Sequence, residues 1–157
     1  MSYKINIKQA VSPEDILSAK QLLVDYQKYL GIDLCFQGFD DELAHLPGKY
    51  APPRGRLYLS EVNDEPAGCI AFYEMEKDVA ELKRLFVKQD FRGAGIGRMM
   101  IERAIADARR IGYKKVRLDS LARLQQASDL YRKLGFDTCE PYNQNPEEDV
   151  YYMELSL

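Results

Sequence analysis

The sequence predicts a mixed α/β fold of the α+β type, in which a mostly antiparallel sheet of about seven strands is flanked by about four helices. Three strand-like runs follow one another between Arg56 and Val87, separated by short turns, and such runs pair as hairpins. Beyond Val87 a helix, a strand and a second helix alternate, which predicts helices on both faces of the sheet. Because 157 residues, 46% of them hydrophobic, suffice for one sizeable core, we expect residues 1–157 to form a single domain.

The N-terminal part of the chain predicts one strand and two helices. Tyr3–Lys8 alternates apolar and polar side chains, the pattern of a half-buried strand. Ser12 followed by Pro13 marks a helix start, and apolar residues at helical spacing continue as far as Gly31, which ends the helix. Phe39–Leu46 predicts a short second helix.

The middle of the chain predicts three consecutive strands. A proline-rich loop at 47–55 comes first, and it either contacts a substrate or stiffens a connection. Strands are then predicted at 56–62, 67–76 and 79–87, with Lys77-Asp78 as the tight turn between the last two.

The C-terminal part alternates helices and strands before it ends in two strands around a loop rich in Asn, Pro and Glu. Helical spacing of apolar residues predicts the longer helix, and a glycine stops each helix. The predicted elements are helices at 94–110 and 125–134 and strands at 115–119, 136–140 and 150–155.

The stretch Val87–Gly97 joins a predicted strand to the longer helix. Gly93, Gly95 and Gly97 remove side chains where the helix begins, and the first N–H groups of a helix have no partners within it. Phosphate oxygens can approach these N–H groups closely, and Arg92 adds a full positive charge. The stretch therefore predicts a site for a diphosphate.

Three kinds of diphosphate ligand are candidates for such a site: a nucleotide held by a P-loop, a dinucleotide and coenzyme A. A P-loop requires Lys-Ser or Lys-Thr after the glycines, and neither follows here. A dinucleotide fingerprint requires a third glycine where Arg98 stands, although Asp119 lies where a ribose-binding acid would be. The third ligand is coenzyme A.

Composition argues against several classes of partner. The net charge of −3 gives no basic surface for nucleic acid, and no apolar run is long enough to cross a membrane or to serve as a signal peptide. Cys35, Cys69 and Cys139 are widely spaced, and His45 is the only histidine. We therefore expect no metal site and no disulfide framework, and a reducing cytoplasm as the location.

Two motifs resemble those of the GNAT acetyltransferase superfamily. Arg-Gly-Ala-Gly-Ile-Gly after a strand ending in Val resembles its motif A, and Tyr131 with Gly135 and Phe136 resembles its motif B. The resemblance implies a fold of the acyl-CoA N-acyltransferase type and acetyl-CoA as the acetyl donor. It also implies direct acetyl transfer to an amine, with no metal. The cofactor-binding residues that it implies are Leu85, Phe86, Val87, Arg92, Gly93, Ala94, Gly95, Ile96, Gly97 and Arg98.

Two catalytic residues follow from the same resemblance. Tyr131 is the candidate acid that protonates the leaving thiolate, and its alternative role is that of a core tyrosine. Glu81 is the candidate base, and its alternative role is to neutralise a nearby cation. A symmetric turn at 77–78 would place Glu74 opposite Glu81, and such a pair would raise the pKa of one carboxyl group. Leu124 departs from the family, many members of which carry Asn there, and Ser120 or Ser128 could supply the missing polar contact.

The acceptor and the assembly are less clearly indicated. A small-molecule amine is the expected acceptor, with Lys83, Arg84 and Arg117 as candidates for holding an acidic group on it. A homodimer is possible in such folds. The alternative to an enzyme is an acyl-CoA-binding module without catalysis, and a nicotinamide dinucleotide protein is a third class.

Overall fold

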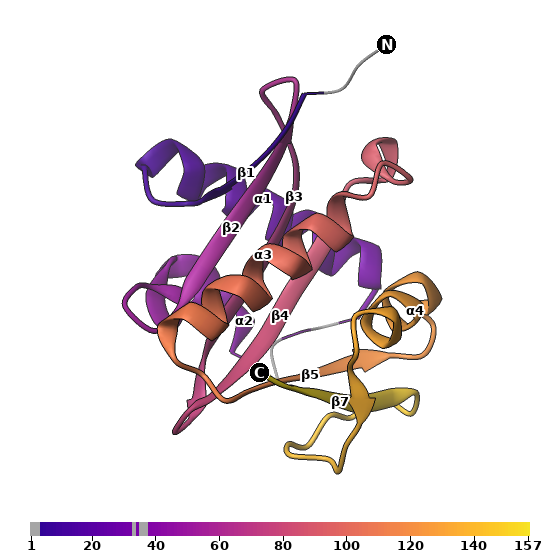
Figure 1. The fold of residues 1–157 in the computed structure, drawn as a ribbon. Helices are drawn as coiled ribbons and strands as arrows, with labels where there is room; N and C mark the ends of the chain where they lie inside the picture. Colours follow the sequence, from indigo (N-terminus) through magenta and orange to yellow (C-terminus); the bar gives the residue numbers. More distant parts are fainter. Residues whose placement is uncertain (1–3, 33, 35–37) are drawn as a thin grey trace.

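The computed structural model describes residues 4–32, 34 and 38–157, and within them a seven-stranded sheet is flanked by four α-helices (Figure 1). The strand order is β1-β2-β3-β4-β5-β7-β6. Only β4 and β5 pair in parallel, and every other neighbouring pair is antiparallel. The strands are β1 (Ile5–Gln9), β2 (Arg56–Val62), β3 (Glu65–Glu76), β4 (Val79–Val87), β5 (Lys115–Leu121), β6 (Asp137–Thr138) and β7 (Val150–Ser156), and the helices are α1 (Pro13–Leu30), α2 (Phe39–Ala44), α3 (Ile96–Ile111) and α4 (Gln125–Lys133).

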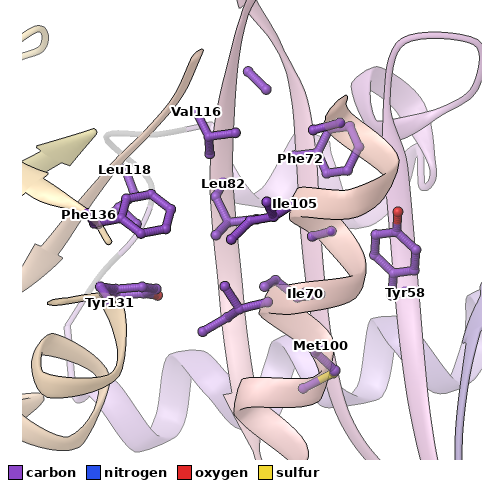
Figure 2. Close-up of a cluster of buried hydrophobic side chains, with 14 of the residues drawn as sticks. Tyr58, Ile70, Phe72, Leu82, Met100, Ile105, Val116, Leu118, Tyr131 and Phe136 are labelled. Carbon is purple, nitrogen blue, oxygen red and sulfur yellow. The ribbon is translucent and has the colours of Figure 1, made fainter. Parts of the chain in front are cut away.

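The sheet separates two hydrophobic cores. Side chains alternate along β3, so that Ile70 and Phe72 face α3 and α4 while Cys69 and Ala71 face α1 and α2. Figure 2 shows the first core, in which Met100 of α3 lies over the strands. The prediction of helices on both faces is therefore confirmed.

Local signals fixed most element boundaries. The hydroxyl of Ser12 accepts a hydrogen bond from the Asp15 N–H at 3.1 Å, and Gly31 ends α1 with φ +67°, as predicted. The longer helix begins at Ile96 rather than at Ala94, because the left-handed backbone of Gly95 (φ +80°) cannot belong to it. Tyr3, predicted to begin the first strand, lies outside the described residues.

Two corrections concern β4. Cys69 pairs with Phe86 and Ala71 with Lys83, so β4 carries one extra residue, a β-bulge at Arg84 with φ +66°. Regular strand alternation predicts Glu81, Lys83 and Leu85 on one face and Leu82, Arg84 and Phe86 on the other. The bulge reverses this alternation beyond Lys83. Phe86 packs in the same core as Ala71, on the α1 side, whereas Leu85 packs toward α3, so the predicted faces of these two residues were wrong.

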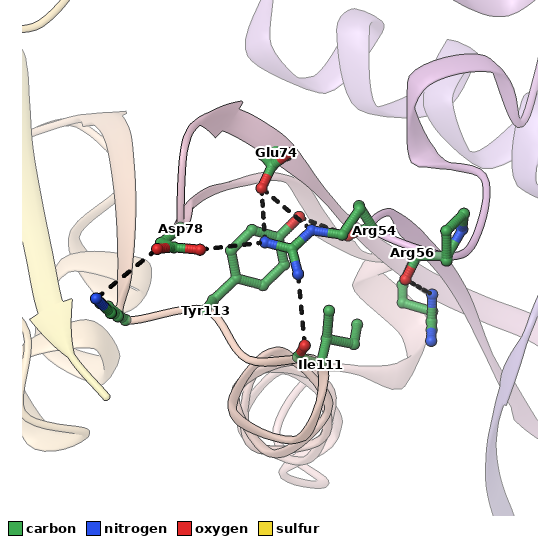
Figure 3. Close-up of polar contacts among 8 residues, drawn as sticks. Arg54, Arg56, Glu74, Asp78, Ile111 and Tyr113 are labelled. Carbon is green, nitrogen blue, oxygen red and sulfur yellow. Dashed lines mark hydrogen bonds and ion pairs between the residues drawn. The ribbon is translucent and has the colours of Figure 1, made fainter.

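The proline-rich loop is anchored at its end by Arg54 (Figure 3). The Arg54 guanidinium donates hydrogen bonds to the Glu74 carboxylate, the shorter at 2.6 Å, and lies 3.8 Å from Asp78. It also stacks 4.2 Å from the centre of the Tyr113 ring, whose hydroxyl donates to the Arg54 carbonyl oxygen at 2.6 Å. These contacts join the loop to the β3–β4 turn, which supports the stiffening role at this end.

None of the described helices combines the length and the apolar character that a membrane crossing requires.

Candidate active site

A groove of about 630 Å³ opens between the start of α3, the end of β4 and the start of α4. All predicted cofactor-binding residues except Ala94 line it. Sequence reasoning did not single out Tyr26 and Tyr29 of α1, which also line it, because residues so distant in the chain meet only in the fold. The predicted residues in the groove wall are Leu85, Phe86, Val87, Arg92, Gly93, Gly95, Ile96, Gly97 and Arg98.

The glycine turn exposes the N-terminus of α3 to this groove. Gly93 and Gly95 have φ of +89° and +80°, a left-handed backbone that other residues adopt only with strain. No side chain among the described residues caps the helix. The first N–H at the helix start that has a backbone partner is that of Met99, which donates to the Gly95 carbonyl oxygen at 3.1 Å. The preceding N–H groups therefore remain available to an anion.

Two arginines add positive charge at the groove. Arg92 is held by a hydrogen bond from its Nε to the Val87 carbonyl oxygen at 2.9 Å and stacks 4.4 Å from the Tyr29 ring centre. Arg98 pairs with Glu102 at 2.8 Å, but more than half of its side chain is exposed. Charge in this position complements an anionic ligand.

The parallel strands β4 and β5 part beside the groove. Their pairing is confined to Val79–Glu81 against Lys115–Arg117, although both strands continue. On the other side β3 stays close to β4, because Gly68 has no side chain: a Cβ there would lie 2.5 Å from the Phe86 carbonyl oxygen. The Leu85–Val87 backbone thus follows a bulge and borders the place where β5 parts from β4, and backbone N–H groups in such a place can donate to an acyl oxygen.

A second, smaller cavity of about 60 Å³ adjoins the groove and is lined by Tyr131, Lys83 and Asp119. Leu124 and Ala127 are among the residues that line both spaces. The sequence suggested Asp119 only as a ribose-binding acid. Its place near Tyr131 depends on the parting of β5 from β4, which no pattern within either strand indicates.

Tyr131, which lines this cavity, is buried and packs edge-on against Phe136, with ring centres 5.6 Å apart (Figure 2). Burial raises the pKa of its phenol well above the usual value, so the hydroxyl keeps its proton at neutral pH. Among the described residues, this hydroxyl has no hydrogen-bond partner. Tyr131 is therefore a core tyrosine, and its protonated hydroxyl is compatible with the predicted acid role.

Glu81 is buried in a polar cluster and lines neither space. The hydroxyl groups of Tyr73 and Tyr142 each donate to its carboxylate at 2.6 Å, and the Lys83 ammonium lies 3.6 Å away. Burial, together with the Glu81 charge, raises the pKa of both phenols, so they remain donors.

The expected pairing of Glu74 with Glu81 was wrong. Glu81 pairs with Tyr73 across the strands, and Glu74 pairs with Ala80, because the end of the hairpin is irregular. Neighbouring residues of a strand point to opposite faces, and Glu74 binds Arg54 instead.

The arginines suggested for an acidic acceptor group already have carboxylate partners. Arg84 binds Glu42 of α2 through two nitrogens, and Arg117 binds Glu154 at 3.1 Å and Glu76 at 2.8 Å.

Leu124, the position at which many family members carry Asn, is the residue directly before α4, and its side chain does not cap the helix. Ser128 donates its hydroxyl proton to Tyr151 and is buried, whereas Ser120 lines the smaller cavity. Of the two serines proposed to replace the usual Asn, Ser120 is therefore the better placed. Within the described residues, no cluster of three or more His, Cys, Asp or Glu could hold a metal ion.

The chain is similar to several known proteins in sequence and in fold. A family model described as the acetyltransferase (GNAT) family matches residues 21–136. An uncharacterized N-acetyltransferase of Schizosaccharomyces pombe is 36% identical over 155 residues, which cover 98% of this chain and 95% of the relative. An acetyltransferase from Streptococcus agalactiae superposes with a TM-score of 0.79 at 21% identity over 98% of both chains. A GNAT acetyltransferase from Elizabethkingia anophelis, solved with acetyl-CoA bound, superposes with a TM-score of 0.65 at 24% identity over 98% of both chains.

Proposed function

This chain belongs to the GNAT acetyltransferase family, and from that premise we propose that it transfers the acetyl group of acetyl-CoA directly to a primary amine. The observation that carries the proposal is the continuity of the groove at the α3 N-terminus with the cavity that contains Tyr131. The groove offers anion-binding N–H groups at the α3 N-terminus, and the cavity offers the protonated phenol of Tyr131. The acetyl-CoA in the Elizabethkingia structure supports this choice of donor.

The groove residues fit coenzyme A as the donor's carrier. We assign the diphosphate to the free N–H groups around Gly95 and to the charges of Arg92 and Arg98. The amide-containing arm has hydrogen-bonding partners in the Leu85–Val87 backbone, where β4 and β5 have parted.

Tyr131 is the proposed acid. As the C–S bond breaks, its hydroxyl gives a proton to the departing sulfur, a role whose removal costs roughly 10²–10⁴-fold in rate. Backbone N–H groups at Leu85–Val87 are the proposed donors to the carbonyl oxygen as it gains negative charge. Glu81 is the proposed base. Since its carboxylate lines neither space, it would receive the amine's proton through a solvent water.

The test compares Tyr131→Phe and Glu81→Gln with the wild type, using acetyl-CoA, a panel of primary amines and detection of the released thiol. We expect a loss of turnover with unchanged acetyl-CoA affinity in both variants. Wild-type protein that binds acetyl-CoA but releases no thiol with any amine would instead indicate an acyl-CoA-binding module. A thermal shift with NAD but not with acetyl-CoA would indicate a dinucleotide protein.

The panel also addresses the acceptor, for which we propose a small-molecule amine. Size-exclusion chromatography with light scattering tests whether the chain forms a homodimer.

A further inference from the structure

Three carboxylates near the smaller cavity differ in what neutralises them. Glu42 is bound by the Arg84 guanidinium, and Glu81 lies beside the Lys83 ammonium. Asp119 lines the cavity itself, and within the described part of the chain no cation forms an ion pair with it. A carboxylate at a cavity wall without a cationic partner is complementary to a cationic ligand.

The partner that Asp119 does have is a neutral N–H donor. The Nδ2 of Asn143, from the loop between β6 and β7, donates to the Asp119 Oδ2 at 2.9 Å. The Tyr152 hydroxyl donates to the Asn143 Oδ1 at 2.8 Å. Because the Asp119 carboxylate can only accept, it requires the nitrogen end of the Asn143 amide to face it, and the Tyr152 hydroxyl then donates to Oδ1.

From these contacts, and resting on the proposed function, we infer that Asp119 binds the nitrogen of the acceptor as an ammonium group. In the free protein, the Asn143 carboxamide occupies the place of that nitrogen. Both donors would bond the same carboxylate, but the ammonium also brings a full positive charge to it, which the neutral Asn143 amide lacks. Binding at Asp119 brings the nitrogen to the cavity that Tyr131 also lines, where the acetyl group would be cleaved.

The other charges at this cavity do not oppose the inference. Lys83 and Arg84 also line it, but the Lys83 ammonium lies 3.6 Å from Glu81 and the Arg84 guanidinium is bound by Glu42, which offset their positive charges. Asp119 therefore binds the incoming ammonium, while Glu81 keeps its proposed role of taking a proton from it before attack.

The experiment follows the side-chain amide signals of Asn143 by NMR in the full-length protein, with Asn143→Ala used to assign them. The probe is ethylammonium chloride, and the matched probe is tetramethylammonium chloride, which carries the same charge but has no N–H. We expect ethylammonium to shift the Asn143 signals saturably and tetramethylammonium to leave them unchanged. Asp119→Asn should abolish the response, and Gln144→Ala, a change at an exposed neighbour in the same loop, should retain it.

Kinetics provide a second measurement. In Asp119→Asn the KM for an amine of the panel should rise roughly 10- to 100-fold, as expected for loss of a hydrogen bond to a charged group, with an unchanged KM for acetyl-CoA. In Asn143→Ala, which leaves Asp119 intact, ethylammonium should bind about 2- to 10-fold more tightly, because its resident competitor is gone. Backbone signals of β5 report that binding.

Equal shifts with both probes, no shift with either, or unchanged ethylammonium binding in Asp119→Asn would overturn the inference. The NMR measurement needs no turnover, so it separates the two proposals. Ethylammonium binding at Asp119 without any acetyl transfer would reject the proposed function alone. Acetyl transfer that is indifferent to Asp119→Asn would reject the ammonium site alone.

Discussion

Arg84 and Glu42 form a two-pronged ion pair, with nitrogen–oxygen distances of 2.9 and 3.0 Å, between the bulge of β4 and helix α2. Both side chains are almost fully buried. The left-handed backbone of Arg84 is unfavourable for a residue with a Cβ, and the ion pair compensates for it. The bulge that shapes the site is thus held by a residue 42 positions away in the sequence.

Glu42→Gln should lower the free energy of unfolding by about 3 kcal/mol or more, because it leaves a buried guanidinium without its counter-charge. Urea unfolding followed by circular dichroism measures the change. The matched control is Glu102→Gln, which breaks the exposed pair with Arg98 and should cost less than about 1 kcal/mol. Equal losses in the two variants would contradict the role assigned to the buried pair.

The glycine turn gives a prediction about acetyl-CoA. Gly95→Ala places a residue with a Cβ at φ +80°, which costs about 1–2 kcal/mol. The turn can relieve this strain by changing its backbone conformation, so that its N–H groups no longer face the groove. We expect roughly tenfold weaker acetyl-CoA binding in calorimetry, equivalent to about 1.4 kcal/mol.

Gly112→Ala is the control for that strain. Gly112 also has a positive φ, +112°, but it lies at the opposite end of α3. This variant should lose stability and keep its acetyl-CoA affinity. If both variants bind acetyl-CoA as the wild type does, the N–H groups of the turn do not hold the diphosphate.

Much of the fold could be predicted because its signals are local. Ser12 and Gly31 delimit α1, and the predicted bounds of β2 and β4 agree with the structure. The glycine turn placed most of the groove residues for the same reason, since a strand, a turn and a helix start are consecutive in the chain.

The remainder of the site depends on contacts between distant residues. Arg84 at the bulge is paired with Glu42 of α2, and one of the two phenols bonded to Glu81 comes from Tyr142, 61 residues later. Strand alternation assumes a regular ladder, so a single extra residue reversed the predicted faces beyond Lys83. No pattern within one element carries such information.

The loop between β6 and β7 gives a prediction about pH. Arg123 hydrogen-bonds Asp149 and lowers the pKa of its carboxyl group from 3.8 to about 2. Because the folded-state pKa is the lower one, the stabilisation is complete above the usual value and disappears as the pH falls toward 2. NMR titration of the Asp149 carboxyl measures this directly. Arg123→Gln should return the pKa toward 3.8, and an unchanged midpoint would show that Arg123 is not its cause.

The two phenols on Glu81 give the last prediction. Tyr142→Phe removes one of two hydroxyl donors from a buried carboxylate, which should cost about 1.5–3 kcal/mol in the free energy of unfolding. Tyr73→Phe removes the other donor and should cost a similar amount. Only Tyr142 lies in the loop between β6 and β7, so only Tyr142→Phe should speed hydrogen exchange in that loop. Tyr29→Phe, at an exposed tyrosine, is the control for loss of a hydroxyl and should leave stability unchanged. If all three variants unfold at the same urea concentration as the wild type, the hydroxyl groups do not stabilise the Glu81 carboxylate.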